Sequence, residues 1–291
     1  MAHHMQKRKD LSIVGHESID HFDEAMKELS SIGHNRRIVG AAVLASVAAL
    51  ILIGGASYCH YARTRETIII DQIRTMAASQ SQAADVFLRE RASLLSVLVE
   101  THPYGQMSRH GVLAGLFTAM NLRGDMLGLL DLGVIDANGH QTAYVGPFDL
   151  RGLNYKEQPW FHEVMTKGKH ISDVYLGYRR QPHFIIAVRG ITGEDSWVLR
   201  ATIDSEVFDR LVLASQTGPL GDAFIINGAG IYQTTPRHLG NVLEPSDVSP
   251  QGFSQGTITV EKKTIDGAAY YYAGAWLRNK NWLLIIRRPA G

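Results

Sequence analysis

The pattern of apolar and polar positions first divides the chain at an uncharged stretch near its beginning. Residues 38–59 contain no Asp, Glu, Lys or Arg, and the part from Ile38 to Ile53 is almost wholly apolar. About 20 such residues cross the hydrocarbon core of a bilayer. The alternatives are a signal peptide, which would be shorter and nearer the start, and a buried helix of a soluble protein. We therefore predict a transmembrane helix over residues 38–60, after a segment of residues 1–37.

A helical pattern continues beyond the apolar stretch. Residues 61–101 contain no Gly or Pro, and apolar residues recur at steps of four and three, as on one face of a helix. The pattern predicts a helix about 60 Å long at 1.5 Å per residue, ended by His102-Pro103. It is either a core helix or a stalk that carries motion or pairs with a second copy. Ala77, Gln80 and Ala83 on the stripe do not favour a strong coiled coil.

Strand patterns follow. Residues 126–135 are typical of a buried strand, Asp136-Ala-Asn-Gly139 of a hairpin turn, and residues 140–145 of the return strand. Residues 197–204 predict another strand, and residues 205–214 a short helix. The mixture indicates an α/β (α+β) fold with antiparallel sheets.

Two short patterns occur twice. Val134–Gly139 has a counterpart in Ile225–Gly230, and Trp197-Val198-Leu199 is echoed by Trp282-Leu283-Leu284 at a similar offset. These repeats predict two related mixed α/β modules. In the second module, Tyr270-Tyr271-Tyr272 would point to alternate faces of a strand, so we expect core on one face and surface on the other.

Composition narrows the function. The chain has 29 Lys and Arg against 28 Asp and Glu, a net charge of +1, so bulk positive charge does not predict a nucleic-acid partner. Cys59 is the single cysteine, which excludes an intrachain disulfide and a CxxC metal site. No GxSxG turn, phosphate-binding Gly loop or HExxH motif is present. The sequence therefore predicts no catalytic residue, no metal and no cofactor.

Candidate binding residues gather in the middle of the chain. The part from Leu153 to Arg189 places aromatic, His and Arg residues among turn signals, a mix that suits a pocket wall and equally a well-packed loop. If residues 197–204 form an extended strand, Val198, Arg200, Thr202 and Asp204 share one of its faces. By the same rule, His183 and Arg189 share a face of the strand over residues 181–189. An Arg and an Asp on one face either pair with each other or await a ligand.

The order of these features resembles the double Cache sensor domain, the extracytoplasmic ligand-binding region of bacterial histidine kinases and chemoreceptors. The resemblance covers residue 62 to the end, and rests on the two helices, the turn at residues 136–139, Tyr155, Trp160-Phe161, Ile171–Tyr175, Pro182–Val188 and Asp204. It implies two PAS-like modules, a membrane-distal one over residues 102–215 that holds the ligand and a membrane-proximal one over residues 216–291. It also implies an amino terminus inside the cell, which the nearly equal numbers of basic residues on the two sides of the span leave open.

The amino-acid-binding branch of that family uses a Tyr, then Arg-x-Trp-Tyr, a later Tyr and an Asp. Trp160, Tyr175 and Asp204 match those places, whereas Gln158 stands where the Arg would be and Phe161 replaces the second Tyr. Because Gln lacks the charged fork that grips a carboxylate, an α-amino acid ligand would need its counter-charge elsewhere. The candidates for this charge are Arg179, Arg180 and Arg200.

We therefore expect the input region of a transmembrane receptor, most simply a sensor histidine kinase, in the inner membrane with residues 61–291 outside the cytoplasm. The alternatives are a chemoreceptor or a cyclase, and a membrane-anchored binding protein or enzyme without signalling. The expected partners are a small polar organic ligand such as an amine or carboxylate, the membrane with a second span after Gly291, and a second copy in a homodimer. The predicted ligand-binding residues are Tyr155, Gln158, Trp160, Phe161, Tyr175, Arg179, His183, Arg200 and Asp204.

Overall fold

The computed structural model describes residues 3–122, 128–148, 150–178, 180–213 and 221–290, with side chains described from residue 39 onward except at residue 62. The chain divides into two compact units, Met1–Glu66 and Thr67–Gly291. One helix, α1 (His3–Thr101), contributes to both units.

The first unit is the amino-terminal part of α1. Its aliphatic side chains from Val39 onward are exposed, and Leu44, Leu50 and Leu52 each keep 69–73% of their surface in contact with solvent. A window of 18 residues in this part has a mean hydropathy of 2.3, and the helix is long and apolar enough to cross a membrane. An exposed apolar surface of this kind is unusual on a soluble protein, and it is the physical basis of the predicted span.

In the second unit α1 is a core helix. Ile73, Ala77, Ala84, Leu88 and Leu95 are completely buried, and steps of four and seven residues place them on one face. The small side chains of Ala77 and Ala84 allow the helix to approach the sheets closely. From residue 67 to its end at Thr101, α1 packs as a core helix, which was one of the two alternatives for residues 61–101.

The first sheet has five antiparallel strands in the order β2-β1-β5-β4-β3. Its strands are β1 (Leu129–Ile135), β2 (Gln141–Val145), β3 (Lys169–Ile171), β4 (His183–Thr192) and β5 (Asp195–Asp204). The second sheet has four antiparallel strands in the order β6-β9-β8-β7. Its strands are β6 (Asp222–Asn227), β7 (Thr259–Ile265), β8 (Ala268–Trp276) and β9 (Trp282–Pro289).

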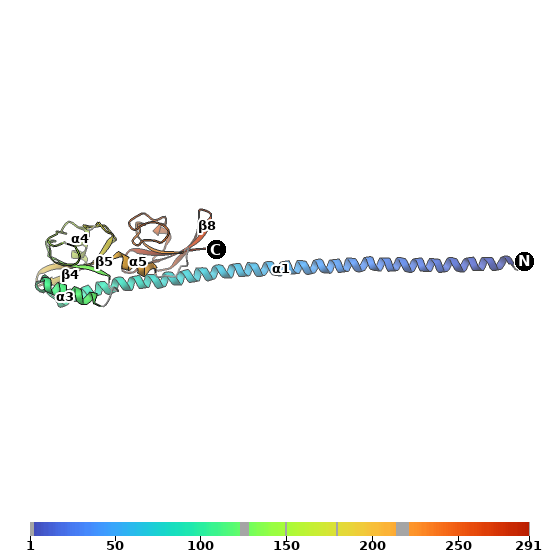
Figure 1. Ribbon diagram of the computed structural model, residues 1–291, viewed down its shortest axis with the longest axis horizontal. Helices are drawn as coiled ribbons and strands as arrows, with labels where there is room; N and C mark the ends of the chain where they lie inside the picture. Colours follow the sequence, from blue (N-terminus) through green and yellow to red (C-terminus); the bar gives the residue numbers. More distant parts are fainter. Residues whose placement is uncertain (1–2, 123–127, 149, 179, 214–220, 291) are drawn as a thin grey trace. The chain divides into compact units, whose positions relative to one another are not determined.

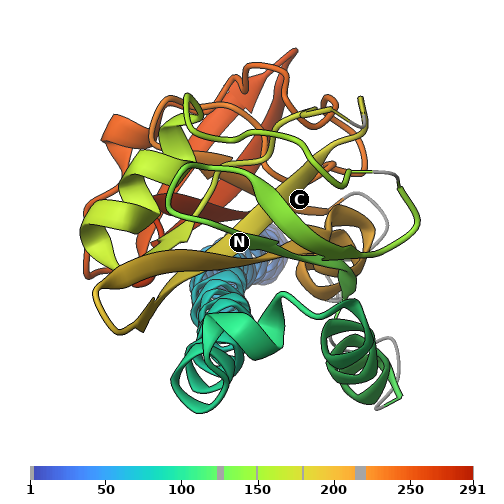
Figure 2. The same ribbon diagram turned by 90° about the vertical axis from the view of Figure 1, so that its left-hand side faces the viewer.

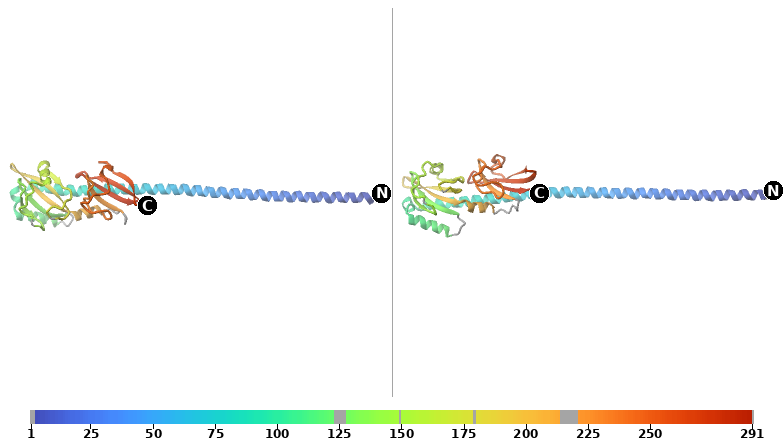
Figure 3. Two further views of the ribbon diagram at one scale, coloured as in Figure 1. Left: turned by 90° about the horizontal axis from the view of Figure 1, so that it is seen from above. Right: turned by 45° about the horizontal axis from the view of Figure 1, so that its top comes forward.

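Helices cover the two faces of the first sheet differently (Figure 2). On one face lie α1, α2 (Tyr104–Met107) and α3 (His110–Asn121), whereas α4 (Pro159–Lys167) lies on the other. The short helix α5 (Ser205–Leu213) follows β5 of the first sheet and precedes β6 of the second. Within the second unit, the two sheets follow one another along α1 (Figure 1 and Figure 3). The long helix and two antiparallel sheets confirm the predicted fold class.

The repeated sequence pattern has a structural counterpart. After β1, the Asp136 carboxylate accepts the backbone N–H groups of Asn138 and His140, each at 2.9 Å. After β6, the Asn227 side-chain oxygen accepts those of Ala229 and Ile231, each at 3.0 Å. Both are Asx turns in which an acceptor two residues before the donor fixes the chain reversal. The first strand of each sheet is therefore followed by an Asx turn of the same kind.

One local prediction needs correction. The tyrosines of β8 alternate between faces as expected, yet neither face is surface, since Tyr271 is 3% and Tyr272 0% exposed. The second face is buried because Tyr271 belongs to the same apolar core as α1.

A buried carboxylate attaches α1 to the turn between β8 and β9. The Asp85 side chain, 8% exposed, accepts the backbone N–H groups of Arg278 and Asn279 at 2.9–3.0 Å. It also accepts the Asn279 side-chain amide at 3.0 Å. A hydrogen bond to a buried charged group is stronger than a neutral one, so Asp85 fixes the register of the helix against the second sheet.

Replacing Asp85 by Ala leaves these amide groups without acceptors. We expect Asp85→Ala to lower the free energy of unfolding by about 3 kcal/mol, measured by urea unfolding of the full chain in detergent micelles. The control is Asp71→Ala, which removes an exposed ion pair with Arg74 and should cost less than about 1 kcal/mol. Equal costs for the two variants would contradict the attachment.

Candidate functional site

The candidate site lies on the face of the first sheet opposite α1, under α4. As strand parity predicts, Val198 on β5 belongs to the apolar cluster of this face, whereas Leu199 belongs to the core around α1. Arg200 therefore points to the α4 side. Its Cα partners are Gly133 on β1 and Ala187 on β4. Small neighbours on both sides leave room for a long guanidinium over the centre of the sheet.

Arg200 is the centre of a buried polar group. It is 3% exposed, and its Nη2 lies 3.3 Å from an oxygen of Asp131, which is completely buried. Its Nη1 donates to the Tyr155 hydroxyl at 2.9 Å, and Tyr144 donates to the other Asp131 oxygen at 3.3 Å. The pairing of an Arg with an Asp is thus present, but the partner is Asp131 on β1 rather than Asp204 on its own strand.

The hydrogen bonds of this group are incomplete. Among the described residues, Arg200 Nε and Gln141 Oε1 are buried with no partner. The side chains of Gln141 and Arg200 both approach Gly133, where an added Cβ would lie 2.5 Å from Gln141 Oε1 and 3.6 Å from Arg200 Nη2. A buried polar atom left without a partner costs about 1–3 kcal/mol. One donor and one acceptor are therefore available here to a polar molecule.

Aromatic side chains cover this polar group. Tyr155 and Trp160 lie with ring centroids 5.3 Å apart, and Tyr178 meets Tyr155 edge-on at 6.0 Å. Trp160 and Phe161 are 6% and 4% exposed, because the start of α4 turns both towards the sheet. Burial raises the pKa of Tyr155, against the opposing charge of Arg200. Tyr155 is therefore a neutral hydroxyl over the whole physiological range.

Tyr175 and His183 form a second aromatic pair at the edge of the site. Their ring centroids lie 4.6 Å apart, and Gly177 closes over them, since an added Cβ there would lie 2.8 Å from the His183 ring. His183 is 4% exposed and its Nδ1 lies 2.8 Å from the Gln181 carbonyl oxygen. Burial raises the pKa of Tyr175 to about 12, although the charge of Arg200 lowers it.

The remaining predicted residues lie further from this centre. Asp204 is opposite His183 in the sheet, and its carboxylate accepts the backbone N–H of Glu206 at 2.9 Å at the start of α5. Gln158 is half-buried at the position before α4 and makes no capping hydrogen bond with its side chain. Arg180 is exposed, and Arg179 lies outside the described residues.

Three residues of the site were not predicted: Asp131, Gln141 and Tyr144. The signal for Asp131 is a single charged residue within the otherwise apolar strand Leu129–Ile135, since a buried charge requires a partner. No comparable signal marks Tyr144 or Gln141, because their role depends on the pairing of β2 with β1.

Asp173 connects the segment beside the site to the second sheet. Its carboxylate accepts hydrogen bonds from Lys280 at 2.8 Å, and from Trp282 Nε1 and the Asn227 side chain at 2.9 Å. Burial tends to raise the pKa of Asp173, but the hydrogen bond and charge of Lys280, with the other two donors, hold it below its ordinary value. Asp173 is only two residues from Tyr175.

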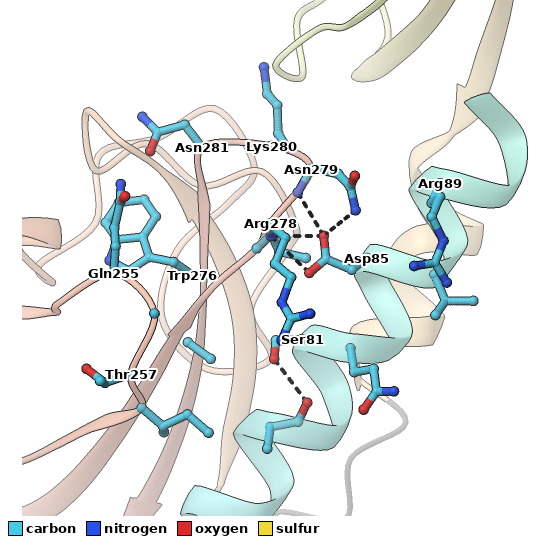
Figure 4. Close-up of a pocket in the computed structure, with 17 residues that line it drawn as sticks. Ser81, Asp85, Arg89, Gln255, Thr257, Trp276, Arg278, Asn279, Lys280 and Asn281 are labelled. Carbon is cyan, nitrogen blue, oxygen red and sulfur yellow. Dashed lines mark hydrogen bonds between the residues drawn. The ribbon is translucent and has the colours of Figure 1, made fainter. Parts of the chain in front are cut away.

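A groove of about 890 Å³ lies elsewhere, between α1 and the turn after β8 (Figure 4). Its walls are largely polar, and Asp85, Arg89 and Arg278 line it. Figure 4 shows the Asp85 carboxylate directed at the backbone of the turn rather than at open space. A small-molecule site usually combines apolar walls with a few convergent polar groups. The sheet face under α4 fits that description better than this groove does.

No known protein family matches the sequence, and no curated protein matches it significantly. Solved structures do match. The extracellular domain of rpHK1S-Z16, described as a histidine kinase, is 17% identical with a TM-score of 0.60, covering 77% of this chain and 95% of that one. The ligand-binding domain of the Pseudomonas aeruginosa chemoreceptor PctB, in complex with L-Gln, is 16% identical with a TM-score of 0.56, covering 75% and 90%.

The ligand-binding domain of the Campylobacter jejuni chemoreceptor Tlp3, in complex with 4-methylisoleucine, is 13% identical with a TM-score of 0.61, covering 78% of this chain and 92% of that one. At such identities the likeness concerns the fold. The chain therefore has the fold of Cache-type extracellular ligand-binding domains of histidine kinases and chemoreceptors. This confirms the resemblance seen in the sequence.

The buried pair gives a stability prediction. Asp131→Asn leaves Arg200 charged and buried without a carboxylate, so the free energy of unfolding should fall by about 3–5 kcal/mol. Combining Asp131→Leu with Arg200→Met, which removes both charges, should restore most of this loss. Urea unfolding of the full chain in micelles measures both. The control is Asp195→Asn, at the exposed start of β5. If Asp131→Asn lowered the free energy of unfolding as little as Asp195→Asn does, the pairing would be refuted.

Asp173 gives a pH prediction. Because its pKa is lower in the folded chain than its ordinary value of 3.8, its ionised form stabilises the fold above that pH, and the contribution is lost as pH falls through the folded pKa. Asp173→Asn should therefore unfold at a lower temperature than the wild type at pH 7. The difference should begin to shrink below about pH 4 and continue to shrink as the pH falls through the folded pKa. Thermal unfolding from pH 3 to 7 measures this, and a difference that does not change with pH would contradict it.

Proposed function

We propose that this chain is the input region of a transmembrane receptor, which binds a small polar organic molecule outside the cytoplasm. The ligand site is the α4 side of the first sheet. The observation that carries the proposal is the buried group around Arg200, in which Arg200 Nε and Gln141 Oε1 have no partner among the described residues. It lies in the first of the two sheets of a Cache-type fold, whose solved examples include domains in complex with L-Gln and L-serine.

The side chains suggest the chemistry of the ligand. Arg200 offers the only guanidinium buried in this face among the described residues, so it takes the place of the Arg that Gln158 does not supply. Asp131 is positioned to accept from an amine or hydroxyl of the ligand. The rings of Trp160 and Tyr155 would contact its apolar part. A small molecule with an anionic end and a donor end, such as an amino acid or a hydroxy acid, fits these groups.

In this proposal the other predicted residues surround the centre. Tyr175 and His183 form the wall at one edge, and Phe161 supports Trp160 from behind, with an edge-on ring contact at 6.0 Å. Asp204 has its carboxylate engaged at the start of α5, so we assign it to placing the strand end rather than to direct contact. Gln158 lies at the margin, where a larger ligand would reach it.

A ligand at this face would act on α1 through hydrogen bonds already described. We call residues 159–175, which run from the start of α4 to Tyr175, the covering segment. Within it, Asp173 binds Trp282 of β9 and Lys280 in the turn before β9. The turn that contains Lys280 is held to α1 by Asp85. We propose that a shift of the covering segment passes along this series of contacts to α1, whose apolar part spans the membrane with the amino terminus inside.

In this proposal, residues 102–215 are the membrane-distal module and residues 216–291 the membrane-proximal module. The helix α1 is the signalling helix. The output is a histidine kinase or a chemoreceptor, because both kinds of receptor have domains of this fold. A homodimer through α1 belongs to the same proposal. A membrane-anchored binding protein without signalling is the second candidate, and it would need no change in α1 when ligand binds.

Calorimetry of the full chain in micelles against amino acids, hydroxy acids, short carboxylates and amines tests the site. For the ligand found, Arg200→Lys should lower the affinity about 30-fold, because Lys keeps the charge but cannot form the two-pronged contact. Arg189→Lys is the matched control, since Arg189 lies on the neighbouring strand and donates to the Met165 carbonyl oxygen. Binding that Arg200→Lys leaves unchanged would remove Arg200 from the site.

A further inference from the structure

The internal repeat extends to buried charged residues. Asp131 on β1 precedes the Asx residue of its turn by five positions (131 to 136), and Asp222 on β6 does the same (222 to 227). Each Asp faces a neighbouring strand that carries a buried Arg, Arg200 on β5 and Arg287 on β9. The second sheet thus repeats the charged residues of the first on its face away from α1.

The two arginines differ in their partners. Asp131 pairs with Arg200, but the Asp222 carboxylate accepts the backbone N–H groups of Ala223, Arg237 and His238, each at 2.9 Å. Within the part of the chain that the structure describes, no carboxylate forms an ion pair with Arg287. The charge of Arg287, 8% exposed, instead lies over the Tyr270 ring, with Cζ 3.9 Å from its centroid.

A buried hydroxyl beside Arg287 is also unsatisfied. Tyr272 is the Cα partner of Arg287 across β8 and β9 and is completely buried. In the described residues, neither its hydroxyl nor Arg287 Nε has a hydrogen-bond partner. Burial raises the pKa of Tyr272 to about 12, although the charge of Arg287 lowers it, so the hydroxyl keeps its proton. Two donors therefore lie next to each other with nothing to accept from them.

The carboxylates near this pair have other partners or are exposed. Asp222, the Cα partner of Arg287, has its carboxylate engaged by three backbone N–H groups. Lys263 Nζ lies 5.4 Å from the centre of the Tyr272 ring and forms an ion pair with Glu261 at 3.3 Å. Asp247 is exposed, where solvent screens its charge. A buried guanidinium that lacks an ion-pair partner is unfavourable in a protein interior. A water molecule would satisfy one donor but would bring no negative charge.

We propose that the second sheet carries a second ligand site, which binds a small carboxylate between Arg287 and the Tyr272 hydroxyl. A planar group with two oxygens can accept from Arg287 Nε and from the hydroxyl together and neutralise the cation. Tyr270 forms the floor under the guanidinium. The apolar neighbours Tyr232 and Phe253, 2% and 4% exposed, restrict the ligand to a short chain. This site goes beyond the proposed function, since it lies in the other module and does not involve Arg200.

Thermal unfolding of the full chain in micelles at pH 7 and constant ionic strength tests the site, with acetate, propionate, chloride and inorganic phosphate as probes. A short carboxylate should raise the midpoint temperature by about 5 °C at a hundred times its Kd. Tyr272→Phe should lower the carboxylate affinity at least tenfold without lowering the midpoint of the ligand-free chain, because an unsatisfied hydroxyl is removed. The matched control is Tyr271→Phe, next to it on the opposite face, which should respond to carboxylate as the wild type does.

The same titration in Arg200→Lys separates this site from the one under α4. A response that persists in Arg200→Lys and is lost in Tyr272→Phe supports the second site, whether or not the first binds anything. The proposal would be overturned by no stabilisation by either carboxylate, by equal stabilisation by chloride, or by a carboxylate response that Tyr272→Phe leaves intact. Loss of the response in Arg200→Lys alone would assign the carboxylate to the first site and overturn the proposal equally.

Discussion

One helix covers one face of both sheets, and the rest of the second unit depends on that contact. The core around α1 includes Leu88 and Leu95 of the helix, Leu132 of the first sheet and Leu284 of the second in a single cluster. Because strand side chains alternate between faces, each strand must present its apolar positions to α1. The buried charged residues of the strands, Asp131, Arg200, Asp222 and Arg287, lie on the opposite face of each sheet.

The two sheets stabilise a buried guanidinium in different ways. In the first, Arg200 has a carboxylate and a hydroxyl, so removing either charge alone costs more than removing both. In the second, the guanidinium of Arg287 is held by aromatic rings and the nearby carboxylate serves the backbone instead. Asp173, which is partly exposed, and the buried Asp85 show a third use of carboxylates, since both tie separate elements together by accepting several hydrogen bonds.

Strand parity and turn chemistry were predictable from the sequence because they depend on neighbouring residues. The face of Arg200, the turn at Asp136 and the end of α1 before Pro103 all follow from local rules. The partner of Arg200 did not follow, since Asp131 is 69 positions away and meets it only through the pairing of β1 with β5. Burial of both faces of β8 was missed for the same reason, because only the packing of α1 covers Tyr271.

The family pattern pointed to the region that we propose as the site but not to every contact within it. Trp160 and Tyr175 lie near the buried group around Arg200, whereas Asp204 is engaged at the start of α5, where unpaired backbone N–H groups need an acceptor. In the proposed site, Arg200 on β5 supplies the charge that Gln158 lacks.

The most direct test of the central claim is a crystal structure of the chain with the ligand identified from the panel. The account predicts ligand density between α4 and the first sheet, with an acceptor of the ligand within hydrogen-bond distance of the Arg200 guanidinium and its apolar part against Trp160. Density in the groove beside Asp85, with the face under α4 closed and unchanged, would contradict it.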